Sequence, residues 1–111
     1  MGDSDETLDD LQAYERRAIG ILKERELRVR EMEDRLTYLD RELKKYTVHQ
    51  LARAGKVLEI QRGEGMRSNM IEQRKKLIAG LAEARTEVNS ARERLAMIVS
   101  DIKALIGQGV Q

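Results

Sequence analysis

The chain has 111 residues, of which 37% are charged and 3% aromatic, and it contains no Phe, Trp, Pro or Cys. A composition so poor in large aromatics is typical of long helices and coiled coils, and it excludes a globular domain built around an aromatic core. The absence of cysteine excludes a disulfide framework and a thiolate site, and a net charge of +1 excludes a chain that is uniformly basic or acidic.

We expect neither a secretory signal nor a membrane span in this sequence. Its first residues are acidic and have no apolar core, unlike a secretory signal. No apolar run approaches the roughly 18–20 residues that span a bilayer. We therefore expect a soluble, cytoplasmic protein.

Residues 1–10 form an acidic helix start that we expect to fray. Carboxylates near a helix N-terminus interact favourably with the helix dipole, so the first helix is expected to begin between Asp5 and Asp10. The helical hairpin is expected to cover residues 11–107, and residues 108–111 are expected to form a C-terminal tail.

The first predicted helix covers about residues 6–60. Its apolar side chains recur in steps of three and four residues, a heptad pattern that keeps one stripe of a helix, here called the seam, against a partner helix. Arg25 fills the only gap. Upstream, Tyr14 and Ala18 lead into the seam through two steps of four, which predicts a stutter in the supercoil. The predicted seam residues of this helix are Leu22, Val29, Met32, Leu36, Leu39, Leu43 and Tyr46.

The heptad frame breaks beyond Tyr46, where the apolar residues fall one position out of phase. Gly55 lowers helix propensity by roughly 1 kcal/mol relative to alanine. The first helix is therefore expected either to continue with a second stutter to about residue 61 or to end near Gly55. Residues 61–69 include a Gly-Glu-Gly run at 63–65, the strongest helix breaker in the chain, and are predicted to form the turn.

The second predicted helix covers about residues 70–106. Asn69 and Glu72 resemble a capping box that would start this helix at Met70, and Gly107 is expected to end it. Its seam runs from Met70 onward with Arg74 in the one gap. The further predicted seam residues are Leu77, Leu81, Ala84, Val88, Ala91, Leu95, Ile98, Ile102 and Leu105.

The two seams mirror each other about one point of the chain. If the chain folds back between residues 63 and 64, Met32 faces Leu95 and Arg25 faces Ile102, and the other seam residues pair in the same way. The pattern predicts an all-α fold in which two long helices form an antiparallel coiled-coil hairpin. The seam arginines would either fix the register or lay their stems on the seam with their charged heads in water.

Apolar side chains beside the second seam exceed what a two-helix contact requires. A small hairpin is also marginally stable without further packing. We therefore expect the hairpin to oligomerise or to pack on a protein partner. The candidate partner surface consists of Ile71, Ile78, Val99 and Ile106.

Positive charge gathers around the predicted turn. Residues 41–76 contain ten basic and four acidic side chains, a net of +6, and folding back in this region would bring them together. Such a patch can be a solvated face, or it can contact an acidic protein surface or nucleic-acid phosphates. The candidate basic patch consists of Arg53, Lys56, Arg62, Arg67, Arg74, Lys75 and Lys76.

No set of residues predicts a catalytic, cofactor or metal site. His49 is the only histidine, and there is no cysteine to join it as a metal ligand. A slim hairpin offers no pocket around a general base. The Gly-Glu-Gly run at 63–65 lacks the strand and the Gly-Lys-Ser/Thr of a phosphate-binding loop. We expect no enzyme activity, no cofactor and no small-molecule ligand.

These features favour a non-enzymatic structural or adaptor subunit of a larger protein assembly, binding its partners through coiled-coil surfaces. One alternative is a nucleic-acid-associated accessory protein that uses the basic turn end. Another is a secretion-apparatus stalk or an export chaperone. This alternative depends only on an analogy of architecture, and no sequence motif supports it.

Overall fold

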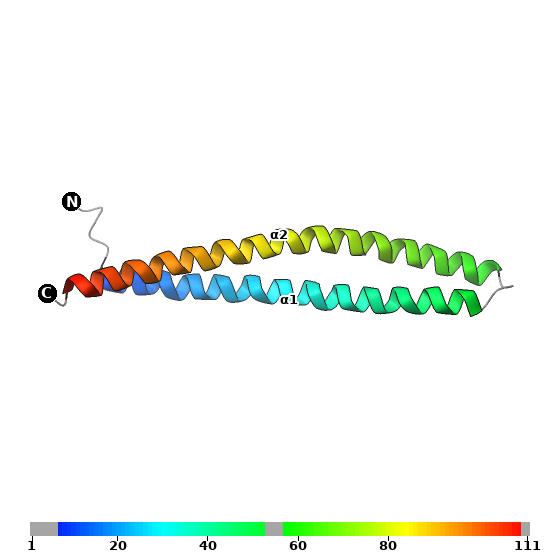
Figure 1. Cartoon of the computed structure of the whole chain (residues 1–111), viewed down its shortest axis with the longest axis horizontal. Coiled ribbons are helices and arrows are strands. Elements are labelled where there is room, and N and C mark those ends of the chain that lie inside the picture. Colours follow the sequence, from blue (N-terminus) through cyan, green and yellow to red (C-terminus); the bar gives the residue numbers. More distant parts are fainter. Residues whose placement is uncertain (1–6, 53–56, 110–111) are drawn as a thin grey trace. The chain divides into compact units, whose positions relative to one another are not determined.

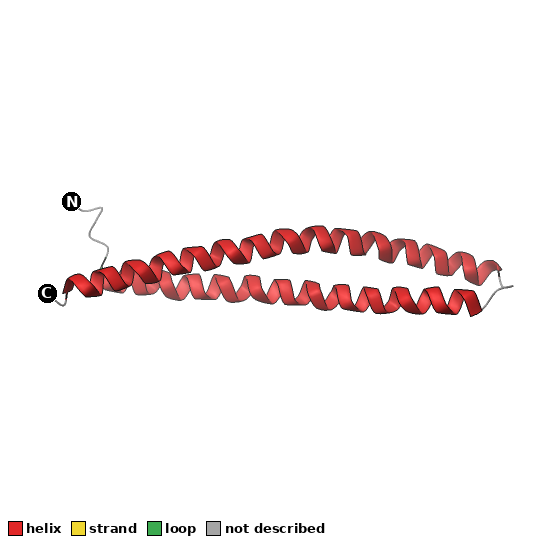
Figure 2. Cartoon of the chain, viewed as in Figure 1, coloured by secondary structure: helices red, strands yellow, loops and turns green. Residues whose placement is uncertain are grey.

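The fold consists of two helices. The computed structural model describes the backbone of residues 7–52 and 57–109 and the side chains of residues 7–45 and 64–108. Helix α1 covers Leu8–Ala52 and helix α2 covers Val57–Gly109, with 45 and 53 residues. These ranges contain no strand (Figure 2). The expected all-α class is confirmed.

The chain divides into two compact units, each of which pairs a segment of α1 with a segment of α2. Unit 1 joins the residues up to Arg28 with those from Ala84 onward, and unit 2 covers Val29–Glu83. Within each unit the two segments lie side by side and run in opposite directions (Figure 1). The antiparallel helix pair that the two seams predict is confirmed.

A capping box that was not predicted from the sequence begins α1. The backbone N–H of Asp10 donates to Oγ1 of Thr7 at 3.1 Å, and the backbone N–H of Thr7 donates to Oδ2 of Asp10 at 3.2 Å. The reciprocal pair satisfies two N–H groups at a point where a helix leaves its first donors without intrahelical acceptors. Helix α1 therefore begins at Leu8, within the expected range of Asp5 to Asp10.

The break between the helices falls earlier in the chain than expected. Helix α1 ends at Ala52 rather than near residue 60, and α2 begins at Val57. The break thus lies close to the second of the two expected end points, although Gly55 itself is outside the described residues. At the other end, α2 continues to Gly109, two residues past the expected stop at Gly107.

Residues 61–69 are helical, so the expected turn at this position is wrong. They belong to α2 together with Asn69 and Glu72, which therefore start no helix. A glycine inside a helix costs only about 1 kcal/mol relative to alanine, a cost that packing along a long seam readily offsets. An added Cβ at Gly65 would meet no atom within 4 Å, so no close approach or turn geometry requires glycine there.

The helices pair in a register displaced by about two heptads from the expected one. In unit 2, Cε of Met32 lies 2.9 Å from the position of a Cβ added at Gly80, although the expected register sets Met32 opposite Leu95. In unit 1, Arg25 binds Glu87 instead of facing Ile102. The same helix faces recur every seven residues, so sliding by whole heptads keeps seam against seam.

The observed register makes use of the first turns of α1. Folding back between residues 63 and 64 would leave Leu11 opposite no residue of this chain, whereas in unit 1 Leu11 is 6% exposed and Ala18 4% exposed. Burial of apolar surface contributes about 25 cal/mol per Å². The expected register would also set Arg74 opposite Arg53, whereas in unit 2 Arg74 pairs with Asp40.

The heptad frame of α1 runs through Ala18 without the expected stutter. Glu15 is half-buried between the buried Leu11 and Ala18, whereas Tyr14 is 39% exposed. Steps through Glu15 alternate between four and three residues, as they do further along the helix. The apolar pattern alone does not indicate this seam position, because a glutamate occupies it.

Candidate functional site

In unit 2 the helices meet along an apolar seam. Leu39 of α1 is 1% exposed and Leu81 of α2 is 5% exposed, and Met32 lies against Gly80. The side chain of Tyr46 is outside the described residues. The other predicted seam residues of this unit are half-buried, namely Val29, Leu36, Leu43, Met70 and Leu77.

In unit 1 small residues occupy much of the seam. Ala18 of α1 and Ala84 and Ala91 of α2 are almost fully buried. Alanines allow two helices to approach closely, but they leave gaps where larger neighbours hold the backbones apart. Val88 and Ile102 are also buried. The other predicted seam residues of this unit are half-buried, namely Leu22, Leu95, Ile98 and Leu105.

Each seam arginine binds a polar group of the opposite helix within its own unit. In unit 1, Nη1 of Arg25 donates to the backbone carbonyl of Glu87 at 3.1 Å. In unit 2, Nε of Arg74 lies 2.6 Å from Oδ1 of Asp40, with 42% and 45% of the two side chains exposed. Exposed pairs of this kind contribute at most about 1 kcal/mol. Their main effect is to distinguish one heptad register from another.

The candidate partner surface is represented in both units. In unit 2, Ile71 is 36% exposed and Ile78, one heptad later on α2, is 43% exposed. In unit 1, Val99 is half-buried and Ile106, again one heptad later, is 49% exposed. Each unit therefore carries a pair of aliphatic side chains at seven-residue spacing beside its own seam.

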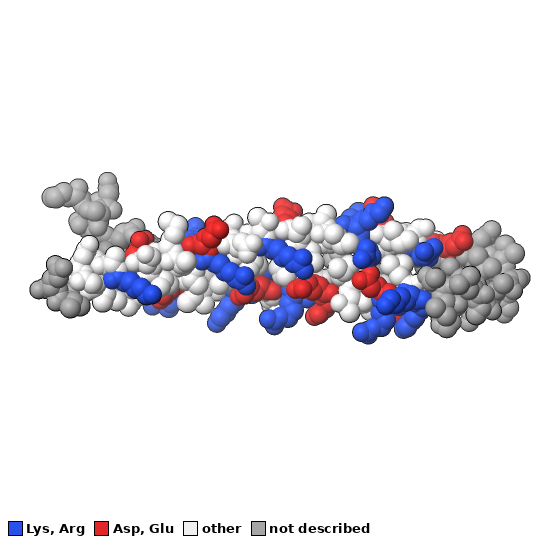
Figure 3. Space-filling model, in the orientation of Figure 1, with Lys and Arg blue, Asp and Glu red and all other residues white. Residues whose placement is uncertain are grey.

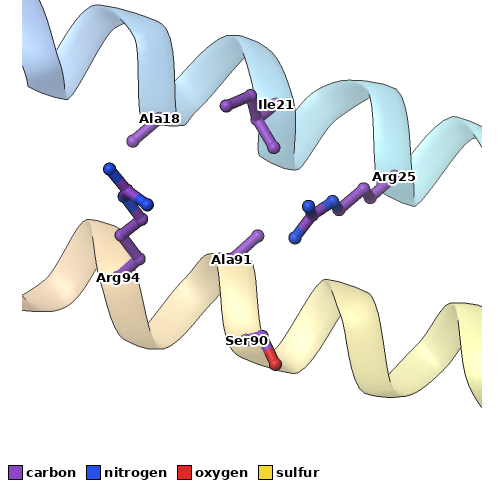
Figure 4. Close-up of a pocket in the computed structure, with 6 residues that line it drawn as sticks. All are labelled: Ala18, Ile21, Arg25, Ser90, Ala91 and Arg94. Carbon is purple, nitrogen blue, oxygen red and sulfur yellow. The ribbon is translucent and has the colours of Figure 1, made fainter.

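Unit 1 contains a hollow of about 290 Å³ between α1 and α2. Ala18 and Ala91 leave this space open because their side chains are short, and Ile21 forms part of its wall. Figure 4 shows the side chain of Arg25 extending from α1 and that of Arg94 extending from α2 into the space between the helices. Sequence reasoning missed the hollow, because Ala18 and Ala91 come together only in the observed register.

The rim of this hollow is cationic and partly apolar. Tyr14, Arg17 and Ile21 adjoin it from α1, and Arg94 adjoins it from α2. Tyr14 and Ile21 are 39% and 36% exposed. In the described part of the chain, neither Arg17 nor Arg94 has a carboxylate within ion-pair distance. The rim is thus suited to a group that combines an apolar side chain with a carboxylate.

Only part of the candidate basic patch lies in the described residues. Arg67, Lys75 and Lys76 are exposed and have no ion-pair partner among the described residues, whereas Arg74 is paired with Asp40. On the face drawn in Figure 3, basic and acidic side chains alternate along the described part of the helices. The side chains of three predicted members are outside the described residues, namely Arg53, Lys56 and Arg62.

Candidate chemistry is sparse within the described ranges. Residues 7–45 and 64–108 contain no group of three His, Cys, Asp or Glu side chains that could hold a metal ion. His49 is outside the described side chains. In the described helices we also find no apolar stretch with the length and hydropathy needed to cross a membrane.

The comparisons with known proteins add no relative. No family model matches the chain, and neither the curated proteins nor the solved structures provide a match. The function must therefore be inferred from the surfaces of the two units.

Proposed function

We propose that this protein is a non-enzymatic structural or adaptor subunit of a larger cytoplasmic assembly. The observation that carries the proposal is the exposure of Ile71 and Ile78, whose side chains are each at least 36% exposed. They lie beside the seam of unit 2, in which Leu39 and Leu81 are already buried between the two helices. Contiguous exposed apolar side chains rimmed by polar ones are typical of interaction sites. Two isoleucines one heptad apart on a single helix edge form the beginning of such a stripe.

The occupant that best fits this stripe is an amphipathic helix of a partner protein. A helix presents apolar anchors at intervals of three, four and seven residues, which matches the seven-residue spacing of Ile71 and Ile78. Lys75 lies between them on the same side of α2 and is exposed, so it places a positive charge within the stripe that favours an acidic residue on the partner helix. The pair Val99 and Ile106 repeats the spacing in unit 1.

Site-specific photo-crosslinking in the cells of origin tests this proposal. A photoreactive amino acid in place of Ile71 or Ile78 should capture the same discrete partner, identified by mass spectrometry. The matched control is Ala79, which is exposed on α2 directly after Ile78 but points away from the stripe by about 100°. Equal capture at all three positions, or no capture at Ile71 and Ile78, would contradict the proposal.

A second candidate function is binding to nucleic-acid phosphates. The observation that favours it is the exposure of Arg67, Lys75 and Lys76 in unit 2, none of which has an ion-pair partner among the described residues. Lysine and arginine that neutralise phosphates release condensed counterions, so cations free of carboxylates are the ones suited to this role.

A further inference from the structure

Three exposed side chains follow one edge of α2 in unit 1. Arg94, Met97 and Asp101 are separated by three and four residues, a spacing that places them on the same side of a helix. We call them the α2 edge. Met97 is 69% exposed, the highest value among the large apolar side chains of the described residues. Neither Arg94 nor Asp101 has an ion-pair partner in the described part of the chain.

The order of charges along the α2 edge is self-complementary. It runs from a cation through an apolar residue to an anion, so a second copy laid antiparallel against it brings opposite charges together at both ends. A parallel copy would set like against like. A two-fold interface requires this reciprocity, in which one residue contacts a second and the second contacts the first across the axis.

The hollow of unit 1 adjoins the α2 edge. Arg94 lines both, and the hollow of about 290 Å³ is floored by Ala18 and Ala91. A methionine side chain is unbranched and flexible, and it fills irregular apolar gaps well. An antiparallel second copy that pairs residues 94 and 101 sets its Met97 opposite Met97 of the first copy, where the two flexible side chains pack together beside the hollow. Apolar contact is needed for affinity, because exposed ion pairs alone contribute little.

We propose that two copies of this chain associate antiparallel through the α2 edge. Met97 of each copy packs against Met97 of the other, and Arg94 of each copy pairs with Asp101 of the other. This surface lies on the opposite side of the seam from Val99 and Ile106, so self-association leaves the proposed partner stripe open. Such self-association does not depend on the proposed adaptor function.

Charge reversal on the full chain tests the proposal. Light scattering should give the mass of a dimer for the natural chain and of a monomer for Arg94→Glu and for Asp101→Arg. Mixing these two variants should restore a dimer, because the all-acidic edge of one complements the all-basic edge of the other. The double variant should also dimerise with itself. Circular dichroism shows whether each variant keeps its helices, which exposed substitutions should leave intact.

Two control variants show whether dimerisation depends on the α2 edge itself or on net charge and exposed apolar surface in general. Glu31→Arg changes the charge by the same amount as Asp101→Arg on an exposed residue of α1 that lies outside unit 1, and it should leave the dimer unchanged. Met97→Ala should weaken association, whereas Leu27→Ala, at a side chain 52% exposed on α1, should not. A natural chain that is monomeric at every concentration, or a dimer that both charge reversals leave intact, would overturn the proposal.

Discussion

At the scale of single residues, two glycines of α2 differ in the space around them and therefore in their effect on stability. Gly65 is exposed, and an added Cβ would meet nothing within 4 Å. Gly80 is half-buried, and an added Cβ would come to 2.9 Å from Cε of Met32. Gly65 therefore lowers helix stability without any packing benefit, whereas Gly80 makes room for a seam side chain from α1.

This contrast predicts opposite effects of substitution. Gly65→Ala should raise the free energy of unfolding by about 1 kcal/mol, because alanine has the higher helix propensity and meets no neighbour. Gly80→Leu should lower it by about 1–3 kcal/mol, because the larger side chain displaces Met32 from the seam. Urea unfolding followed by circular dichroism measures both values.

Gly65→Leu serves as the control for Gly80→Leu, since leucine has open space at that position. A loss of stability on Gly65→Ala would show that residues 63–65 form a turn, as expected from the sequence, because a turn that needs glycine does not tolerate a Cβ. The same pair of variants thus tests the helical assignment of this segment.

At the scale of the helices, a few polar contacts distinguish the observed register from its alternatives. In unit 2, Nη2 of Arg35 donates to Oε1 of Gln73 at 3.3 Å, and Arg74 pairs with Asp40. In unit 1, Glu87 receives hydrogen bonds or ion pairs from both Arg25 and Arg28. Each contact joins residues that the register folded at 63–64 would separate.

Spin labels on Arg35→Cys and Gln73→Cys should therefore lie close together. In the register folded at 63–64, the same two positions would be separated by roughly 28 Å along the helix axis, at 1.5 Å per residue. Pulsed electron resonance measures the distance. Labels on Arg35→Cys and Arg94→Cys provide the complementary pair, since these are the positions that the alternative register brings together. A short distance for that pair would contradict the observed register.

Much of the fold was predictable because a heptad pattern reports directly on which helix face is buried. Both seams and the antiparallel arrangement follow from the apolar residues alone. The turn was not predictable by the same means, since a slide of two heptads leaves every face unchanged. The Gly-Glu-Gly run predicted the turn at the wrong position, because the helix-breaking propensity of two glycines is weaker than the packing of a long seam.

The candidate surfaces were predictable to different degrees. Ile71, Ile78 and Ile106 could be placed beside the seam from spacing alone, which does not depend on the register. The hollow could not be predicted, because it exists only where Ala18 and Ala91 come together. The Thr7–Asp10 capping box was readable from the sequence, since a threonine followed three residues later by an acid is a recognised start signal.

At the scale of the whole molecule, charge is nearly balanced but unevenly distributed. The net charge is +1, while residues 41–76 carry a net of +6. The near balance argues against long-range attraction to a polyanion by the chain as a whole. Any contact with nucleic acid must therefore depend on local cations, among which Arg67, Lys75 and Lys76 of α2 are exposed and have no ion-pair partner among the described residues.

Salt dependence tests this local contact. If the patch binds duplex DNA, the logarithm of the binding constant should fall linearly with the logarithm of salt concentration. Lys75→Ala combined with Lys76→Ala should reduce the slope by about 0.9 for each phosphate that is no longer neutralised. Fluorescence anisotropy with a labelled duplex measures the slope. Lys103→Ala removes one positive charge from unit 1 and should leave the slope unchanged. A binding constant that does not change with salt concentration would exclude the nucleic-acid function.

The shared heptad of the two helices also determines how such a chain can change over generations. A gain or loss of seven residues in α1, matched by seven in α2, returns every remaining seam side chain to its face. An unmatched single residue rotates everything beyond it by about 100° and exposes its seam. Viable relatives of this hairpin should therefore differ in length by whole repeats, with each helix growing or shrinking in increments of about 10 Å.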